Sequence, residues 1–168
     1  MTKHIVWATL FILIAGILQS TLLSHMRPLL SASPDIALCI LIYSAYLNGA
    51  MTGQLTGFFS GILLDFLSAS PLGLNIFVRT LIGGACGLLR GSFFLDAVFL
   101  PMALSAVATL LKALIHFLLN ILFAGAVPAY SFTSGVLWME TLLNAICTPF
   151  IFAVLKSFGA LLTSQKES

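Results

Sequence analysis

The sequence predicts an all-α polytopic membrane protein with six transmembrane helices in one transmembrane domain, residues 1–168. Of the 168 residues, 60% are hydrophobic and 7% are charged, whereas a soluble domain carries roughly 25% charged residues. The mean hydropathy is +1.14. Six spans of about 20 residues use most of the chain, so no soluble domain fits. The net charge of +2 is small and dispersed, which argues against nucleic-acid binding.

The apolar runs define six spans in order, over residues 5–23, 34–49, 52–67, 72–89, 97–123 and 136–162. The first span resembles a signal peptide, because Lys3 precedes a long apolar run, and we interpret it as a retained signal anchor. The second span begins with Pro34 in the first turn and Asp35 at the positive end of the helix. Both residues mark a helix start.

The basic residues predict the orientation of the spans. With six spans, Lys3, Arg90, Lys156 and Lys166 fall on one side of the membrane, and only Arg27 lies in a loop on the other side. Cytoplasmic loops carry the excess of Lys and Arg. We therefore expect both termini to be cytoplasmic.

Small residues recur at four-residue spacing along the third span, in two neighbouring rows: Gly49, Gly53, Gly57 and Gly61, then Thr56 and Ser60. We call the first row the glycine face. A helix face almost without side chains lets another helix approach closely within a membrane. This face either packs the third and fourth spans together or docks a separate transmembrane helix. On the docking interpretation, Gly57→Leu is expected to weaken partner association without unfolding the protein.

The glycine face ends in Asp65, a carboxylate at the edge of the hydrocarbon, where an ionisable group is costly and usually functional. The chain then turns at Pro71 and Gly73. In an antiparallel hairpin Asn75 lies close to Asp65, and Arg79 lies about 7 Å deeper, within reach of an extended side chain. We predict a polar anchor of Asp65, Asn75 and Arg79, acting as a charge pair, a ligand or partner contact, or an ion relay.

A second polar group, which we call the polar seam, joins the fifth and sixth spans: Lys112, His116 and Asn120 on one, Glu140 and Asn144 on the other. The four-residue spacing places each row on one helix face. Antiparallel packing predicts Glu140 against Asn120 and His116, and Asn144 against His116 or Lys112. The seam either fixes the register of the two helices by hydrogen bonds or forms a polar pocket or a seat for a partner helix.

Motifs for catalysis are lacking, so we do not expect an enzyme and predict no metal or cofactor. Cys39, Cys86 and Cys147 lie more than ten residues apart in apolar runs, a spacing that does not suit metal or redox motifs. Asp65 and Asp96 fall on opposite membrane sides in the six-span topology. They are therefore too far apart to share a proton as a catalytic dyad.

Three features occur together and in order: the run Pro34-Asp35-Ile36, the glycine face ending at Asp65, and the turn Ser70-Pro71-Leu72-Gly73. In these features the chain resembles the MreD family of bacterial rod shape-determining proteins. Length, span count and a polar tail agree over essentially the whole chain. The loop at residues 48–52 departs from the family, because it lacks the basic residues that members often carry there.

The resemblance implies a non-enzymatic, multi-pass component of the bacterial cytoplasmic (inner) membrane. Its expected partners are the lipid bilayer and an MreC-like bitopic protein and, indirectly, MreB-like filaments, a RodA-like glycosyltransferase and a penicillin-binding transpeptidase. Gly53, Gly57 and Gly61 are the residues expected to dock the partner helix. The alternative function is a substrate-binding membrane subunit of a small-solute, vitamin-type transporter, with the polar seam lining its pocket.

Overall fold

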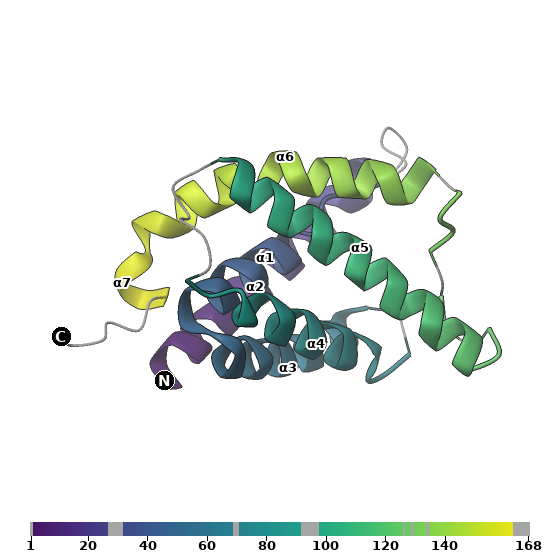
Figure 1. The fold of residues 1–168 in the computed structure, drawn as a ribbon, viewed down its shortest axis with the longest axis horizontal. Helices are drawn as coiled ribbons and strands as arrows, with labels where there is room; N and C mark the ends of the chain where they lie inside the picture. The colour runs from purple at the N-terminus through teal and green to yellow at the C-terminus, as the bar shows by residue number, and fades with distance from the viewer. Residues whose placement is uncertain are drawn as a thin grey trace.

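The computed structural model describes residues 2–26, 32–68, 71–91, 98–125, 127–128, 130–133 and 135–162. The described chain is all-helical (Figure 1), with these elements: α1 (Thr2–Met26), α2 (Ile36–Asn48), α3 (Ala50–Leu67), α4 (Leu74–Leu88), α5 (Phe99–Leu122), α6 (Gly135–Ser157) and α7 (Gly159–Leu162). Four residues named above, Arg27, Ser70, Asp96 and Lys166, lie outside the described residues.

Each of the six predicted spans overlaps one helix, and the last is interrupted at Phe158, where α6 gives way to the single turn of α7. Among the described residues, α5 and α6 are long and apolar enough to cross a membrane, whereas the apolar stretches of α1, α2 and α4 are shorter. The all-helical class is therefore confirmed. Six membrane crossings, for which the other four helices are also needed, stay a prediction.

Figure 1 shows α3 and α4 side by side along the long axis of the molecule, with α5 and α6 forming a V above them. The arms of the V diverge toward the connection between these two helices. Both ends of the chain lie at the other end of the molecule. An even number of antiparallel helices brings both ends of a chain to the same end of the molecule, and this chain shows that arrangement.

Helix α2 is the centre of the packing. Nearly all of its residues are buried, and it contacts α1, α3, α4, α5 and α6. The helix has no polar face, since its sequence IALCILIYSAYLN is apolar on every side, and a helix that is hydrophobic all round is normally buried. Through α2, the α1–α4 group and the α5–α6 pair share one core.

The helix ends follow local sequence. The Asp35 carboxylate accepts a hydrogen bond from the Leu38 N–H at 2.9 Å. Asp35 is thus the N-cap of α2, which begins at Ile36, and Pro34 precedes the helix in place of lying in its first turn as predicted. The turn before α4 contains Gly73 at φ +94°, a conformation that favours glycine. At the end of α5, Ala124 adopts φ +46° and the Gly125 N–H donates to the Asn120 carbonyl at 2.8 Å, the pattern of a Schellman cap.

Candidate functional site: a buried ion network and two apolar grooves

The glycine face of α3 packs directly on the backbone of α4. A Cβ atom on Gly57 would lie 2.7 Å from the carbonyl carbon of Arg79, and one on Gly61 would lie 2.5 Å from the Cα of Ile76. A Cβ atom on Gly53 would overlap the backbone of Gly83. The two helices are therefore in backbone contact along these three positions.

The prediction that this face docks a separate helix is wrong for Gly53, Gly57 and Gly61, because α4 already occupies it. Thr56 and Ser60 are fully buried beside them. The structure leaves no space for a side chain at Gly57, so Gly57→Leu is now expected to disturb the fold. The alternative interpretation, packing of the third and fourth spans, describes the structure.

Gly49 has a different role, because it alone connects α2 to α3. Its φ is +91°, and the nearest atoms to a Cβ built on it belong to the Arg90 side chain, at 3.4 Å. A single-residue connection with positive φ needs glycine. Gly49 thus serves the turn rather than a docking surface.

Asp65 caps the N-terminus of α4. Its carboxylate accepts hydrogen bonds from the backbone N–H groups of Gly73 at 2.8 Å and Asn75 at 3.0 Å, and from the Asn75 side-chain amide at 2.9 Å. The first N–H groups of a helix have no partner within the helix, and a negative charge there is favourable. The predicted proximity of Asp65 and Asn75 is confirmed, and the turn at Pro71 and Gly73 brings them together.

Arg79 does not join Asp65, so the predicted three-residue anchor is wrong. Its guanidinium Nη2 lies 3.1 Å from the Asp35 carboxylate. The Asp65 carboxylate is hydrogen-bonded to the backbone at the N-terminus of α4, whereas the Arg79 side chain extends from α4 toward the start of α2. Asp35, predicted only as a favourable negative charge at the start of the second span, is the acidic partner that the sequence reasoning missed.

Asp35 belongs to a chain of ion pairs that joins four helices. The Lys112 ammonium lies 2.8 Å from the second carboxylate oxygen of Asp35 and 2.9 Å from the Glu140 carboxylate. The order is Arg79, Asp35, Lys112 and Glu140, from α4, α2, α5 and α6. The two positive charges are balanced by the two negative charges, and buried charges in proteins are normally paired in this way. We call these four residues the ion network.

Polar residues of α5 and α6 do contact each other as the polar seam predicts, but the residues that pair differ from the predicted ones. Glu140 pairs with Lys112 and not with His116 or Asn120. The Asn144 amide donates to the Thr109 hydroxyl at 2.9 Å, and its carbonyl oxygen accepts from the Asp35 N–H at 2.7 Å. The pairings of α5 with α6 are thus shifted by one turn or more toward the start of α5.

The divergence of α5 and α6 explains this shift (Figure 1). The last turns of α5 lie beyond the reach of α6 and contact the connecting segment instead. There the Asn120 amide donates to the Val127 carbonyl, and the His116 ring lies 5.5 Å from the ring of Tyr130. His116 and Asn120 are therefore partners of the connection and not of Glu140 or Asn144.

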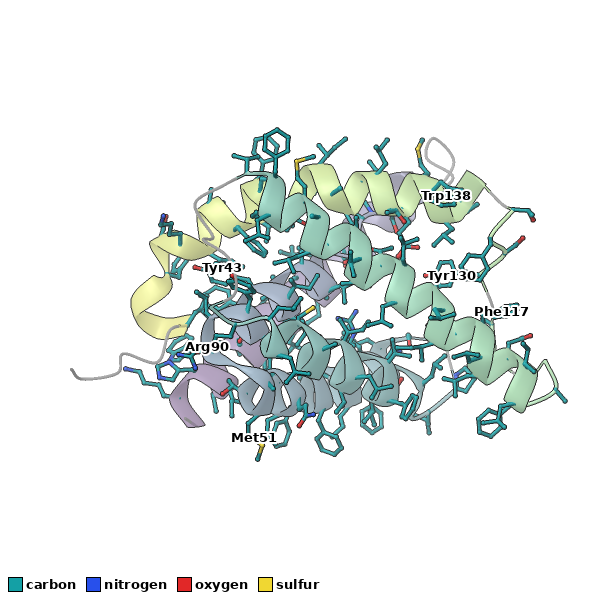
Figure 2. All side chains as sticks on the ribbon, viewed as in Figure 1. Tyr43, Met51, Arg90, Phe117, Tyr130 and Trp138 are labelled. Atoms are coloured by element: carbon teal, nitrogen blue, oxygen red, sulfur yellow. The ribbon has the colours of Figure 1, made fainter. Side chains whose placement is uncertain are left out.

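Tyr130 closes the ion network from the side of the connection. Figure 2 shows it between α5 and α6, and the Lys112 ammonium lies 5.7 Å from its ring centre, a cation–π distance. Burial raises the pKa of the Tyr130 hydroxyl, which keeps it neutral. Among the described side chains near this network, Arg79 Nη1 and His116 Nδ1 are buried without a hydrogen-bond partner.

The network holds helices together and offers no reactive group of its own. Lys112 is engaged by two carboxylates, and both carboxylates are engaged by bases. Within the described ranges, no group of three or more His, Cys, Asp or Glu residues is placed to hold a metal ion. Cys39 contacts the Thr148 hydroxyl at 3.2 Å and is a free, buried thiol.

Two apolar grooves open on the outside of the helical array, one on each side of α1. The larger, about 660 Å³, runs between α1 and α3 and is lined by residues such as Val6, Leu10, Phe59 and Leu63. Thr9 also lines it, and the Thr9 hydroxyl has no hydrogen-bond partner in the part of the chain that the structure describes. The smaller, about 310 Å³, lies between α1 and α6 over α2.

The fold and these sites define a class: an all-helical membrane protein whose buried charges bind its own helices together and whose outer faces are apolar. The model of the family described as rod shape-determining protein MreD matches residues 1–158, and the chain belongs to this family. The resemblance found in the sequence is thereby confirmed. Comparisons with curated proteins and with solved structures gave no match.

Family membership implies a role in rod shape determination. It also identifies the chain as a bacterial membrane protein of the shape machinery, within a family of structural components and not of known enzymes. MreC-type partners are consistent with this system.

Proposed function

We propose that this chain is a non-enzymatic scaffold of the cell-elongation machinery that docks the membrane helix of an MreC-like bitopic protein. The observation that carries the proposal is the internal pairing of the ion network, in which Asp35, Lys112 and Glu140 are bound to groups of the same chain. These buried charges are engaged within the chain, which leaves the apolar outer faces of the helices as the candidate surface for a partner helix.

The groove between α1 and α3 is the docking surface that we infer for this helix. Its lining extends from Ile5 to Leu13 on α1 and from Leu55 to Leu63 on α3, about 12 Å along each helix at 1.5 Å per residue. Helix association in membranes rests on van der Waals contact and interhelical hydrogen bonds.

Docking of this kind gives the chain a place in a larger assembly. The bitopic partner extends to the far side of the membrane and, in our proposal, connects MreB-like filaments to a RodA-like glycosyltransferase and a penicillin-binding transpeptidase. The basic residues Lys3, Arg90 and Lys156 lie toward the helix ends at which both termini are found. By the positive-inside rule, that end is cytoplasmic.

The test is affinity purification of the tagged chain from its own host in mild detergent, with mass spectrometry of the copurified proteins. Val6 lines the groove and is 63% exposed, whereas Val107 lies on α5 and is 61% exposed. We expect Val6→Trp to lose the bitopic partner and Val107→Trp to retain it. Retention of the partner at wild-type stoichiometry by Val6→Trp would contradict the proposed docking surface.

The alternative function, a substrate-binding subunit of a small-solute transporter, makes a different prediction in the same experiment. Two buried nitrogen atoms without hydrogen-bond partners, Arg79 Nη1 and His116 Nδ1, are the observation that favours a polar ligand in this part of the fold. Copurification of paired ATPases and a second membrane subunit, without cell-wall polymerases, would support this function and reject the scaffold.

A further inference from the structure

The helical array consists of two parts that are each held together by their own contacts. In the α1–α4 group, α2 contacts α1, α3 and α4, and the backbones of α3 and α4 touch. In the α5–α6 pair, the Lys112 ammonium lies 2.9 Å from the Glu140 carboxylate, and the Asn144 amide donates to the Thr109 hydroxyl at 2.9 Å. Figure 1 shows this pair as a V that lies over the α1–α4 group.

The ion network divides evenly at the boundary between these two parts. The Arg79–Asp35 pair lies within the α1–α4 group, and the Lys112–Glu140 pair lies within the α5–α6 pair. Of the three ion pairs in the network, only Lys112–Asp35, at 2.8 Å, crosses the boundary. If this contact breaks, each part keeps one acid and one base. Separation therefore leaves no uncompensated buried charge, which is the main cost of breaking a buried ion pair.

Two further polar contacts cross the boundary near Asp35. Its N–H donates to the Asn144 carbonyl oxygen at 2.7 Å, and Cys39 Sγ lies 3.2 Å from the Thr148 hydroxyl. Helix α2 also packs against α5 and α6. Within a membrane such apolar packing has no hydrophobic driving force, because lipid tails are as apolar as the side chains. The polar contacts at Asp35 therefore contribute much of what keeps this end closed.

Two buried polar atoms close to Lys112 and Asp35 have no hydrogen-bond partner in the described part of the chain: Arg79 Nη1 and His116 Nδ1. Arg79 belongs to α4, and His116 lies on α5 one turn after Lys112, so the boundary has one such atom on each side. A buried polar atom without a partner is costly. The closed arrangement thus leaves hydrogen-bonding capacity unused, and water that entered between the two parts would satisfy it.

The opposite end of the α5–α6 pair is held by different contacts. The Asn48 amide at the end of α2 donates to the Leu162 carbonyl of α7 at 2.7 Å, and α7 also contacts α1. The ring of Phe158, between α6 and α7, lies 5.4 Å from the ring of Phe11. These contacts lie at the end where both termini are found (Figure 1) and do not involve the ion network.

We propose that the α5–α6 pair is a movable part of the protein, hinged at α7 and held closed at the other end by the Lys112–Asp35 ion pair. Opening moves α5 and α6 away from the start of α2, admits water to the ion network and leaves a neutral ion pair on each side. The chain then has two states between which a binding partner can select. This inference does not depend on the proposed docking surface.

The test is double electron–electron resonance spectroscopy of the full chain in lipid nanodiscs, with spin labels on introduced cysteines. One label pair, Phe66→Cys on α3 and Leu142→Cys on α6, reports on the end that opens. The matched control, Met51→Cys and Val154→Cys, uses the same two helices at the hinge end. All four side chains are exposed. We expect the first label pair to show a second, longer distance and the control to show one distance.

Two of the native cysteines can stay in the labelled chain. Cys39 and Cys86 are buried, which protects them from the label and keeps the contact of Cys39 with Thr148. Cys147 is partly exposed and is replaced by alanine.

Two double variants remove the Lys112–Asp35 contact without leaving an unpaired charge. Lys112→Met with Glu140→Met removes the ion pair of the α5–α6 pair, and Asp35→Met with Arg79→Met removes that of the α1–α4 group. Thermal unfolding in detergent first shows whether each variant folds. We expect each to raise the ratio of the longer to the shorter distance about tenfold, the factor that corresponds to the loss of one charge-assisted hydrogen bond.

Three outcomes would overturn the proposal. One unchanged distance from the first label pair, in the wild-type chain and in each double variant that folds, would mean that the two parts form one rigid body. Equal lengthening in both label pairs would mean separation without a hinge. Failure of both double variants to fold would mean that the Lys112–Asp35 contact is a requirement of the fold and not a contact that opens.

Discussion

Gly57→Ala separates packing from docking at the glycine face. An added Cβ would lie 2.7 Å from the Arg79 carbonyl carbon and 3.0 Å from the Thr80 Cα, where ordinary contact begins at 3.4 Å. The backbone of α4 must therefore withdraw by most of an ångström, and overpacking of this kind costs about 1–3 kcal/mol. For a chain of this size, that cost corresponds to a decrease in Tm of roughly 2–12 °C.

The matched control is Gly84→Ala, in the interior of the adjacent helix. Its added Cβ would meet only the flexible Gln54 side chain, at 2.9 Å, so it carries the same gain in helix propensity without the backbone clash. Thermal unfolding in one detergent, followed by circular dichroism, compares the two variants. Equal Tm values for Gly57→Ala and Gly84→Ala, together with loss of the partner from the first, would refute the packing account and restore docking.

Three further predictions concern polar contacts and helix ends. In double-mutant cycles with alanine, measured by thermal unfolding in detergent, Asp35 and Arg79 should show an interaction energy of about 0.5–3 kcal/mol, whereas Asp65 and Arg79 should be additive; coupling of the second pair alone would reverse our assignment. Asp65→Ala should lower stability by about 0.5–2 kcal/mol through loss of the α4 cap, and an unchanged Tm would exclude that cap. Ala124→Gly should raise stability by about 1 kcal/mol, because Ala124 has φ +46° and left-handed backbone is costly for alanine; a lower Tm would contradict this.

The helices could be predicted from the sequence because each depends on local features. Each helix is a predominantly apolar stretch, and its ends are set by nearby residues such as Asp35, which caps α2, and Gly73, which takes positive φ before α4. The proximity of Asp65 and Asn75 was predictable for the same reason, because a short turn leaves little freedom in a helical hairpin. Local constraints of this kind need no knowledge of how the helices pack.

The partners of Arg79 and Lys112 could not be predicted in the same way. Reasoning within each hairpin paired Arg79 with Asp65, and Asn144 with either His116 or Lys112. The structure pairs both bases with Asp35, which is 44 residues from Arg79 and 77 from Lys112. The choice among distant partners depends on which helices are neighbours, and α2 contacts both α4 and α5. The sequence order of the spans does not contain that information.

For a related reason, the sequence could not predict which helix packs against the glycine face. A row of small residues predicts close approach of a helix but not which helix approaches. Gly83 and Gly87 of α4, at the same four-residue spacing, meet the α3 backbone at Gly53 and Ala50. Complementary rows on two consecutive helices of an antiparallel hairpin are best satisfied by each other, which leaves neither row available to a separate chain.

Depth in the membrane is the feature of the sequence that carries information about the ion network. Asp35 begins α2, and Arg79 and Glu140 each lie five residues into α4 and α6. Lys112 lies ten residues before the end of α5, so all four charges fall in the same half of the helical array. Hydrocarbon cannot solvate these charges. Asp65, two residues before the end of α3, lies at the same end of the array, so depth alone offers three acids to two bases. Depth therefore restricts the partners of Arg79 and Lys112 to this set, and the choice of Asp35 over Asp65 depends on how α2 packs against α4 and α5.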